Sequence, residues 1–222
     1  MPPVSEPPIS SLIRREAGSN GYVSGSVDVS RIETHASTRW LQLQTISYRF
    51  DQDEPNKYDR HWDIVNRATR TAMDVDAVVV LARLRLADDV ERVLLVKQFR
   101  PPLNAVSVEL PAGLVDEGES LAEAALRELK EETGFQGRIT RTHAAAALSP
   151  GLSAENVSLV EVEVEGTSEG QQLDGNENIE VVSVPLHRME EALEHMINTE
   201  GVVAMHAVST LALGLRLGLT PR

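Results

Sequence analysis

Residues 113–135 read GLVDEGESLAEAALRELKEETGF, and this stretch predicts one helix with a defined start and a defined end. Ser120 followed by Glu123 is a capping box, in which two side chains satisfy main-chain N–H groups in the first turn of a helix. Gly134 is typical of the residue that follows a helix, because glycine adopts the left-handed backbone conformation at little cost. We therefore expect a helix over residues 120–133.

The glutamates of this helix lie on an unexpected side. With about 100° between successive residues, the apolar arc consists of Leu121, Ala122, Ala125, Leu126 and Leu129. Glu128 and Glu132 fall at the edge of that arc, and Glu131 lies one step further round. Burying two like charges one turn apart is unfavourable unless a cation compensates them. Carboxylates without His or Cys favour Mg²⁺ or Mn²⁺, so the helix is a candidate cation site.

An ordinary solvated helix face is the alternative explanation. Arg127 and Lys130 can pair with the glutamates at helical spacing, and acid-rich surface helices are common. The helix sequence by itself does not separate the two explanations.

The chain of 222 residues is acidic, with a formal net charge of −13. Residues 111–222 contain 19 Asp/Glu against 7 Lys/Arg, so nearly all of the excess lies there. This distribution argues against nucleic-acid binding, which needs a basic stripe for the phosphates. The absence of cysteine excludes disulfides, zinc–thiolate sites and thiol nucleophiles. We expect an intracellular protein, located in the cytoplasm, with the nucleus as a second location.

A membrane protein is not expected either. Leu12 and Ile13 are an isolated apolar pair followed by charged residues, which is unlike a signal peptide. The most apolar run, residues 202–219, is interrupted by polar side chains and predicts an amphipathic helix.

Two regions precede the main domain. Residues 1–26 are rich in Pro, Ser and Gly, which predicts a flexible leader. Residues 27–74 predict a small antiparallel β unit, because apolar and aromatic residues alternate loosely at 40–50 and 61–65 around a turn at 51–58.

Residues 75–222 predict a mixed α/β domain. Apolar and alternating segments predict strands over residues 75–84, 90–99, 105–110, 156–164 and 179–184. Helical patterns cover residues 120–133, about 186–198, and 202–217. Strands and helices that follow one another without strict alternation predict an α/β sandwich around a mixed sheet.

The spacing of residues around the central helix resembles a known motif. The Nudix box is matched at each of its specified positions by Gly113, Glu119, Arg127-Glu128-Leu129, Glu131-Glu132 and Gly134-Phe135. The chain thus resembles the Nudix hydrolases. The resemblance implies a Nudix-type α/β/α sandwich whose loop–helix–loop binds divalent cations. It also implies a reaction that cleaves a nucleoside diphosphate linked to another moiety.

The resemblance assigns roles to the charged residues of the helix. Glu128 and Glu132 would be the principal metal ligands, and Glu131 a further ligand or a catalytic base. Arg127 would orient a carboxylate. Hydrolysis of a pyrophosphate fits this arrangement, because metal ions neutralise the phosphates and acidify the attacking water.

Residues beside the helix receive roles from the same resemblance. The backbone carbonyl of Ala112 would bind a metal, and Leu114 would line the wall of the substrate site. Gly113 would permit the tight loop before the helix, and Glu119 would be structural.

Features outside the box resemble the ADP-ribose pyrophosphatase branch, and most of all the eukaryotic ADP-sugar pyrophosphatases. Pro150 stands fifteen residues after the end of the box, and VKQFRPP at 96–102 and ELPAG at 109–113 look like that branch. Trp40 and Trp62 fall where those enzymes stack adenine. The implied reaction is Mg²⁺-dependent hydrolysis of ADP-ribose and related ADP-sugars to AMP and ribose 5-phosphate, with Mn²⁺ as a second possible cation.

The resemblance also implies a substrate site. Trp40 and Trp62 would hold the adenine between two indoles, although packing within a β-hairpin is the alternative explanation for both. Asp63 would contact the base or the ribose, and Arg67 and Arg100 the diphosphate or the ribose. A homodimer that exchanges its N-terminal β unit would let each adenine site draw on both chains.

A catalytic base is expected in the polar loop GQQLDGNEN at residues 170–178. The resemblance points to Glu177 as the base or as a late metal ligand, and a solvated loop acid is the alternative. Ser149 stands where the most similar relatives carry an acidic residue, so contacts to the terminal ribose are not predicted.

Two other functions stay open at this stage. One is hydrolysis of oxidised nucleoside diphosphates or dinucleotides, which the box does not distinguish. The other is a non-catalytic Nudix module that binds ADP-ribose, although the complete box favours an enzyme. The expected partner is a small nucleoside diphosphate sugar, with neither nucleic acid nor membrane.

Overall fold

The computed structural model describes residues 27–50, 60–68 and 75–218. The expected leader at 1–26 and the expected turn at 51–58 lie outside these residues. The chain divides into two compact units, Met1–Ala36 with Leu43–Ile64 and Ser37–Gln42 with Val65–Arg222.

Three strands form a separate antiparallel sheet in the order β1-β2-β3. Their bounds are β1 Val27–Ser37, β2 Leu41–Phe50 and β3 Arg60–Arg67. The strands expected at 40–50 and 61–65 are therefore confirmed as β2 and β3. The sequence pattern does not predict β1, every residue of which is exposed, because an exposed strand has no buried face to impose an alternating pattern.

A nine-stranded sheet forms the centre of the larger unit. Its strands are β4 Ala77–Arg85, β5 Glu91–Arg100, β6 Ala105–Glu109, β7 Ala112–Leu114, β8 Gln136–Thr142, β9 Ala146–Ala147, β10 Asn156–Glu165, β11 Ile179–Pro185 and β12 Val203–Ala204. The main path runs β12-β6-β5-β4-β10-β8, and β11, β7 and β9 pair with β5, β4 and β10. Because β10 is parallel to β4 while β5 is antiparallel to it, the expected mixed sheet is confirmed.

The helices of the larger unit are α2 Leu121–Thr133, α3 Met189–His195 and α4 His206–Arg216. Short 3₁₀ helices lie at η2 Pro101–Leu103 and η3 Leu186–Arg188, and a π-helix, η4, at Met196–Glu200. None of the helices in residues 27–50, 60–68 and 75–218 is long and apolar enough to cross a membrane.

Two of the expected helices differ from those observed. The helix expected over 186–198 is a succession of 3₁₀, α and π turns. The helix expected over 202–217 begins only at His206, because Val203 and Ala204 pair with Ser107 and Val108 of β6. Pairing with a sheet edge overrides the helical pattern of this apolar run.

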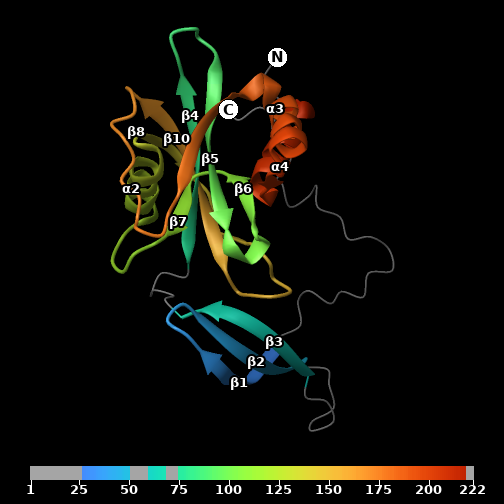
Figure 1. Ribbon diagram of the computed structural model, residues 1–222. Coiled ribbons are helices and arrows are strands. Elements are labelled where there is room, and N and C mark those ends of the chain that lie inside the picture. Colours follow the sequence, from blue (N-terminus) through green and yellow to red (C-terminus); the bar gives the residue numbers. More distant parts are fainter. Residues whose placement is uncertain (1–26, 51–59, 69–74, 219–222) are drawn as a thin grey trace, which may run out of the picture. The chain divides into compact units, whose positions relative to one another are not determined.

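Alternating side chains of β4 build two cores on the two faces of the sheet. Val78, Val80 and Ala82 pack in the core that contains α2. Leu81 packs in the core that contains α3 and α4, with Met189 and other apolar residues of those helices. Figure 1 shows α2 on one side of the sheet and α3 and α4 on the other. The larger unit is therefore the expected three-layer sandwich.

Both ends of α2 agree with expectation. Ser120 and Glu123 form the capping box: the Ser120 hydroxyl accepts from the Glu123 N–H at 3.2 Å, and the Glu123 carboxylate from the Ser120 N–H at 2.9 Å. Gly134 follows the helix with a φ of 72°.

The buried stripe of α2 is rotated from the expected arc. Ala124, absent from that arc, is fully buried, whereas Leu126 is 36% exposed. The two alanines at 124 and 125 leave the helix little bulk on this side, so its backbone can approach the sheet closely. The rotation brings the glutamates into the packed face.

Candidate active site

Glu128 and Glu132 of α2 are buried between the helix and the sheet. Their exposed fractions are 9% and 2%. A solvated face is therefore the wrong explanation for these two glutamates. Glu131, one step round the helix, and Lys130, on its far side, are half-buried.

The electrostatic setting of the two buried glutamates is unfavourable for negative charge. Burial is the main cause that raises the pKa of Glu132 to about 8, and the charges of Glu128, Glu177 and Glu109 add to it. Burial also raises the pKa of Glu128, although hydrogen bonding from Arg127 opposes the shift. A bound cation would reverse both effects, because it favours the ionised carboxylates.

Arg127 joins the helix acids to the loop that precedes them. Its Nε and Nη2 atoms donate to Glu119 at 2.8 and 2.9 Å, and Nη1 donates to Glu128 at 2.7 Å and Glu131 at 3.1 Å. Nη2 also donates to the Leu114 carbonyl oxygen at 2.9 Å. The hydrogen bonds to Glu119 are the main cause that raises the pKa of Arg127. The guanidinium thus holds two helix acids and the chain at Leu114 in one arrangement.

Gly113 lies in strand β7, not in a tight loop, and its φ is not left-handed. A Cβ atom at this position would lie 1.9 Å from Oε1 of Glu128. The expected reason for a glycine here is therefore wrong: the residue provides space for the Glu128 carboxylate, and no turn requires it.

Ala112 connects β7 directly to α2. Its N–H donates to Oε2 of Glu132 at 3.0 Å, while its backbone pairs with Val79 of β4. Consecutive residues of β7 thus face the two buried glutamates.

The donor set fits a hard divalent cation in chemistry. It consists of carboxylate oxygens whose ionised form is disfavoured by burial, and which Mg²⁺ or Mn²⁺ would stabilise as carboxylates. In the described part of the chain, however, no three His, Cys, Asp or Glu side chains are already gathered closely enough to hold a metal. Arg127 and the Ala112 N–H occupy carboxylate oxygens that a cation would need.

Glu109 is a buried acid of this region that the sequence reasoning missed. It is 5% exposed and accepts from Nε and Nη2 of Arg100 at 2.7 Å each, and from the Ser107 hydroxyl. The hydrogen bonds to Glu109 are the main cause that raises the pKa of Arg100, and the charges of Glu132 and Glu177 add to the effect. The available signal was an acid at the end of the apolar strand AVSVE.

Glu177 lies in the loop between β10 and β11. Its carboxylate accepts from the Asp174 N–H at 2.9 Å, and its own N–H donates to the Asp174 carbonyl at 2.9 Å. The charge of Glu177 affects the pKa values of Glu128, Glu132 and Arg100. The loop therefore brings another acid to the electrostatic environment of the helix.

The other expected substrate residues fall in both compact units. Trp40 and Arg67 belong to the larger unit, where Arg39 lies 4.4 Å from the Trp40 ring centre and Arg67 pairs with Glu155 at 2.6 Å. Trp62 and Asp63 belong to the smaller unit. Asp63 accepts from the Thr45 hydroxyl at 2.6 Å, and each tryptophan is 49% exposed. Within the larger unit the structure brings together Arg100, Leu114 and the helix acids.

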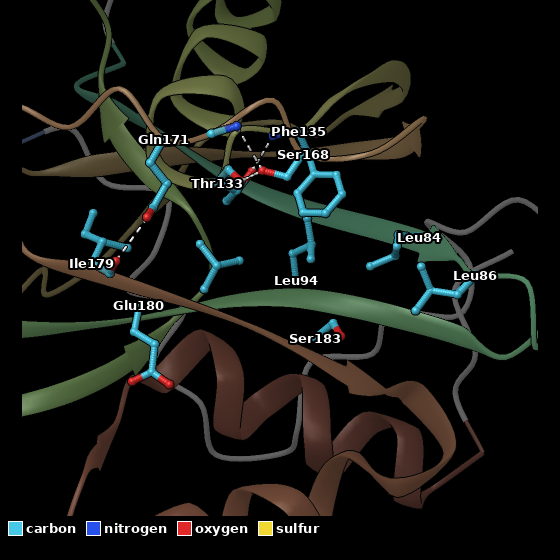
Figure 2. A pocket seen from close by; sticks show the side chains of 12 residues that line it. Leu84, Leu86, Leu94, Thr133, Phe135, Ser168, Gln171, Ile179, Glu180 and Ser183 are labelled. Carbon is cyan, nitrogen blue, oxygen red and sulfur yellow. Dashed lines mark hydrogen bonds between the residues drawn. The ribbon is translucent and has the colours of Figure 1, made fainter.

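A cavity of about 650 Å³ lies beside the end of α2 (Figure 2). Its lining is part apolar and part polar and consists of Leu84, Leu86, Leu94, Thr133, Phe135, Ser168, Gly170, Gln171, Ile179, Glu180, Val181 and Ser183. Glu128, Glu131, Glu132 and Glu177 do not line it. The cavity is therefore separate from the acidic face of α2.

Comparison with known proteins identifies a matching domain family. Residues 75–204 match the NUDIX domain, whose family generally uses divalent metal ions. ADP-ribose pyrophosphatase of Saccharomyces cerevisiae is 39% identical over 173 residues, which cover 75% of this chain and 73% of the yeast protein. ADP-sugar pyrophosphatase of Mus musculus is 35% identical over 162 residues, covering 71% and 72%.

A crystal structure of an ADP compounds hydrolase has the same fold, with a TM-score of 0.61 at 21% identity and coverage of 87% of this chain and 94% of that one. The domain match spans more than half of the sequence, and the relatives align over most of it. The chain belongs to the Nudix hydrolase family.

Proposed function

We propose that this protein hydrolyses ADP-ribose and related ADP-sugars to AMP and ribose 5-phosphate or another sugar phosphate, with Mg²⁺ as its cofactor. The observation that carries the proposal is that Glu128 and Glu132 are buried in a Nudix domain, where burial disfavours their ionised forms unless a cation binds them. The yeast and mouse relatives are named for ADP-ribose and ADP-sugar pyrophosphatase activity, which supports this choice of substrate.

Glu128, Glu131 and Glu132 would hold the metal together with the backbone carbonyl of Ala112. Mg²⁺ is the proposed ion and Mn²⁺ a substitute, because all of these donors are hard oxygens. When bound, the ion neutralises diphosphate oxygens and makes a water molecule more acidic. Arg127 keeps Glu128 and Glu131 oriented through the hydrogen bonds described above.

Glu177 is the proposed base. Its carboxylate would accept a proton from the attacking water as the water oxygen bonds to one phosphorus of the diphosphate. The bond from that phosphorus to the bridging oxygen breaks, and the bridging oxygen leaves on the other phosphate. For this step Glu177 would exchange its hydrogen bond with the Asp174 N–H for one with the water. Glu131 is the alternative base.

Substrate binding is assigned to residues around the two tryptophans. Trp40 and Trp62 would stack on adenine, and each has about half of its surface exposed and accessible to a ligand. Asp63 would contact the base or the ribose. Arg67 and Arg100 would contact the diphosphate or the ribose, and both are now held by carboxylates that a phosphate can replace. Leu114 would form the wall beside the helix.

A homodimer with exchanged N-terminal β units is part of the proposal. Support comes from β1, which is exposed along its whole length and carries exposed Val27, Val29 and Ile32. A three-stranded sheet needs an apolar face covered for stability, and a second copy would provide that cover. Light scattering on the purified protein is expected to give twice the mass of the chain.

Product analysis tests the enzymatic proposal. Purified protein with Mg²⁺ is expected to release AMP from ADP-ribose, and Glu132→Gln is expected to abolish most of this release. A panel of ADP-sugars, dinucleotides and oxidised nucleoside diphosphates, compared by kcat/KM, then ranks the substrates. Saturable binding of ADP-ribose without turnover in excess Mg²⁺ would instead identify a binding module and contradict the proposal.

A further inference from the structure

The C-terminal end of α2 is held by the loop that leads to Glu177. The last carbonyl groups of a helix have no partners within the helix. Here four consecutive carbonyl oxygens, those of residues 131–134, accept hydrogen bonds from residues 168–172, which we call the strap. The Gln172 N–H donates to the Glu131 carbonyl at 2.8 Å, and Gln171 Nε2 donates to the Glu132 carbonyl at 2.6 Å. The Ser168 hydroxyl donates to the Thr133 carbonyl at 3.0 Å, and the Glu169 N–H donates to the Gly134 carbonyl at 2.8 Å.

The strap lies in direct contact with the helix end. A Cβ atom on Gly134 would lie 2.4 Å from the Ser168 hydroxyl oxygen and 2.7 Å from main-chain atoms of Gly170. Figure 2 shows Ser168 beside Thr133, with Phe135 next to them. A larger residue at position 134 would therefore push the strap away from the helix.

Gln171 makes two of the hydrogen bonds that fix this region. Its Nε2 donates to the carbonyl of Glu132 and also, at 3.0 Å, to the carbonyl of Ile179, which begins β11 (Figure 2). Because both partners are carbonyl oxygens, the amide group must present its NH₂ end to them, and both N–H bonds can be used.

The two hydrogen bonds of Gln171 fix the loop that carries Glu177. Residues 172–178 lie between Gln171 and Ile179, so the side chain of Gln171 closes the base of the loop that carries Glu177. The contact with Glu132 attaches that closed loop to the helix of the buried acids. Closing the base of a loop reduces the positions available to residues within it.

We propose that Gln171 is a positioning residue that acts through Glu177. It holds the loop in the place from which the Glu177 carboxylate meets the attacking water, and it touches neither the substrate nor the reacting atoms. This inference rests on the proposed function, and specifically on Glu177 as the base.

The test compares Gln171→Ala, Gln171→Glu and a matched control, Gln172→Ala, in the full chain with Mg²⁺ and ADP-ribose. The Gln172 side chain makes no hydrogen bond within the described residues, and alanine keeps the N–H that this residue contributes to the strap. Gln171→Glu has nearly the same shape but removes both N–H donors. It also places a carboxylate, which can only accept, opposite the carbonyl oxygens of Glu132 and Ile179. We expect both Gln171 variants to lower kcat by roughly tenfold with KM changed less than twofold, and Gln172→Ala to match wild type.

A double-mutant cycle with Glu177→Gln separates positioning from general stabilisation. If Gln171 acts through Glu177, adding Gln171→Ala to Glu177→Gln lowers kcat no further. An additive loss, or a loss confined to KM, would overturn the inference. If Gln171→Ala does not give folded protein, the cycle is run with Gln171→Glu under the same criteria.

Failure of the proposed function has a different signature. If the wild-type protein does not release AMP from ADP-ribose, both the proposed function and this inference are wrong. If wild type is active and Glu177→Gln matches it, the assignment of the base and the role of Gln171 are wrong while the hydrolase remains. If Glu177→Gln is slow and Gln171→Ala is not, only the inference about Gln171 is wrong.

Discussion

Two buried glutamates of this domain differ in how their charge is compensated. Glu161 of β10 is 7% exposed and has two basic side chains as partners, His143 at 2.7 Å and Arg83 at 3.9 Å. Glu132 of α2 is 2% exposed, and within the described residues its carboxylate accepts a hydrogen bond only from a main-chain N–H. Buried charge is normally paired, so this difference singles out Glu132 as a candidate ligand-binding carboxylate.

The largest difference between the two glutamates is expected in catalysis. Glu132→Gln should lower kcat for ADP-ribose by roughly 10²- to 10³-fold, since an interaction with the transition state is lost. Glu161→Gln should leave kcat within about twofold, because its partners belong to the fold. Steady-state kinetics at saturating Mg²⁺ measure both. Equal losses in the two variants would remove the distinction between them.

A smaller loss is expected when a neighbour displaces Glu128. Gly113→Ala places a Cβ where the Glu128 carboxylate now lies, so the carboxylate must move. A shift of about 1 Å at a reacting centre can cost about 10²-fold, and we expect a fall in kcat of that order. The matched control is Gly214→Ala in α4, where a Cβ meets no atom within 4 Å. Wild-type kcat for Gly113→Ala would show that Glu128 need not stay where it is.

The stability of the metal-free protein should depend on pH through Glu132. Its pKa is raised to about 8 by burial, from 4.5 when unperturbed. The stability that this raised pKa provides is fully present below the pKa of the unfolded chain, 4.5. It is lost as the pH rises through the pKa of the folded protein, about 8. Between pH 5 and 8 the free energy of unfolding should fall by about 1.4 kcal/mol per pH unit from this group.

Urea unfolding with a chelator measures this effect as a difference between variants. The stability of Glu132→Gln relative to wild type should increase from pH 5.5 to pH 7.5, because the variant has no proton to lose. Parallel curves for Glu132→Gln would mean that Glu132 is already ionised without a metal.

The smallest effect, on stability alone, is expected when His143, the partner of Glu161, is replaced. His143→Ala removes one hydrogen bond to Glu161 and leaves Arg83 in place. A loss of about 1 kcal/mol in the free energy of unfolding is expected, with kcat unchanged. The control is His187→Ala, at an exposed histidine, which should leave the free energy of unfolding unchanged. A loss of activity in His143→Ala would connect the pair of His143 and Glu161 to catalysis.

Local signals in the sequence predicted much of the fold. The capping box of Ser120 and Glu123 and the glycine at 134 located α2 to within one residue. Apolar runs located β4 and β5, because strands buried on both faces are apolar along their length. Alternating apolar and polar residues located β10. Short strands such as β7 and β12 were not predicted, since two or three residues carry no period and only the neighbouring strand selects them.

The site was predicted less completely than the fold. The spacing of the acids on α2 singled out Glu128 and Glu132, but a helical wheel gave the rotation of the helix incorrectly, with Leu126 inside and Ala124 outside. The rotation depends on how small residues pack against the sheet, which a single helix does not encode. Glu109 and the strap contacts of Gln171 join residues distant in sequence, and no local pattern announces them.

The hydrogen bond from Ala112 to Glu132 gives the protein a natural spectroscopic probe. The amide proton of Ala112 points at a carboxylate that changes charge when it loses its proton and changes partners if a cation arrives. Its chemical shift and its exchange with solvent therefore follow the state of Glu132 without any label in the site. The resonance of the Ala112 amide proton in β7 would therefore report whether Glu132 is protonated, ionised or bound to a cation.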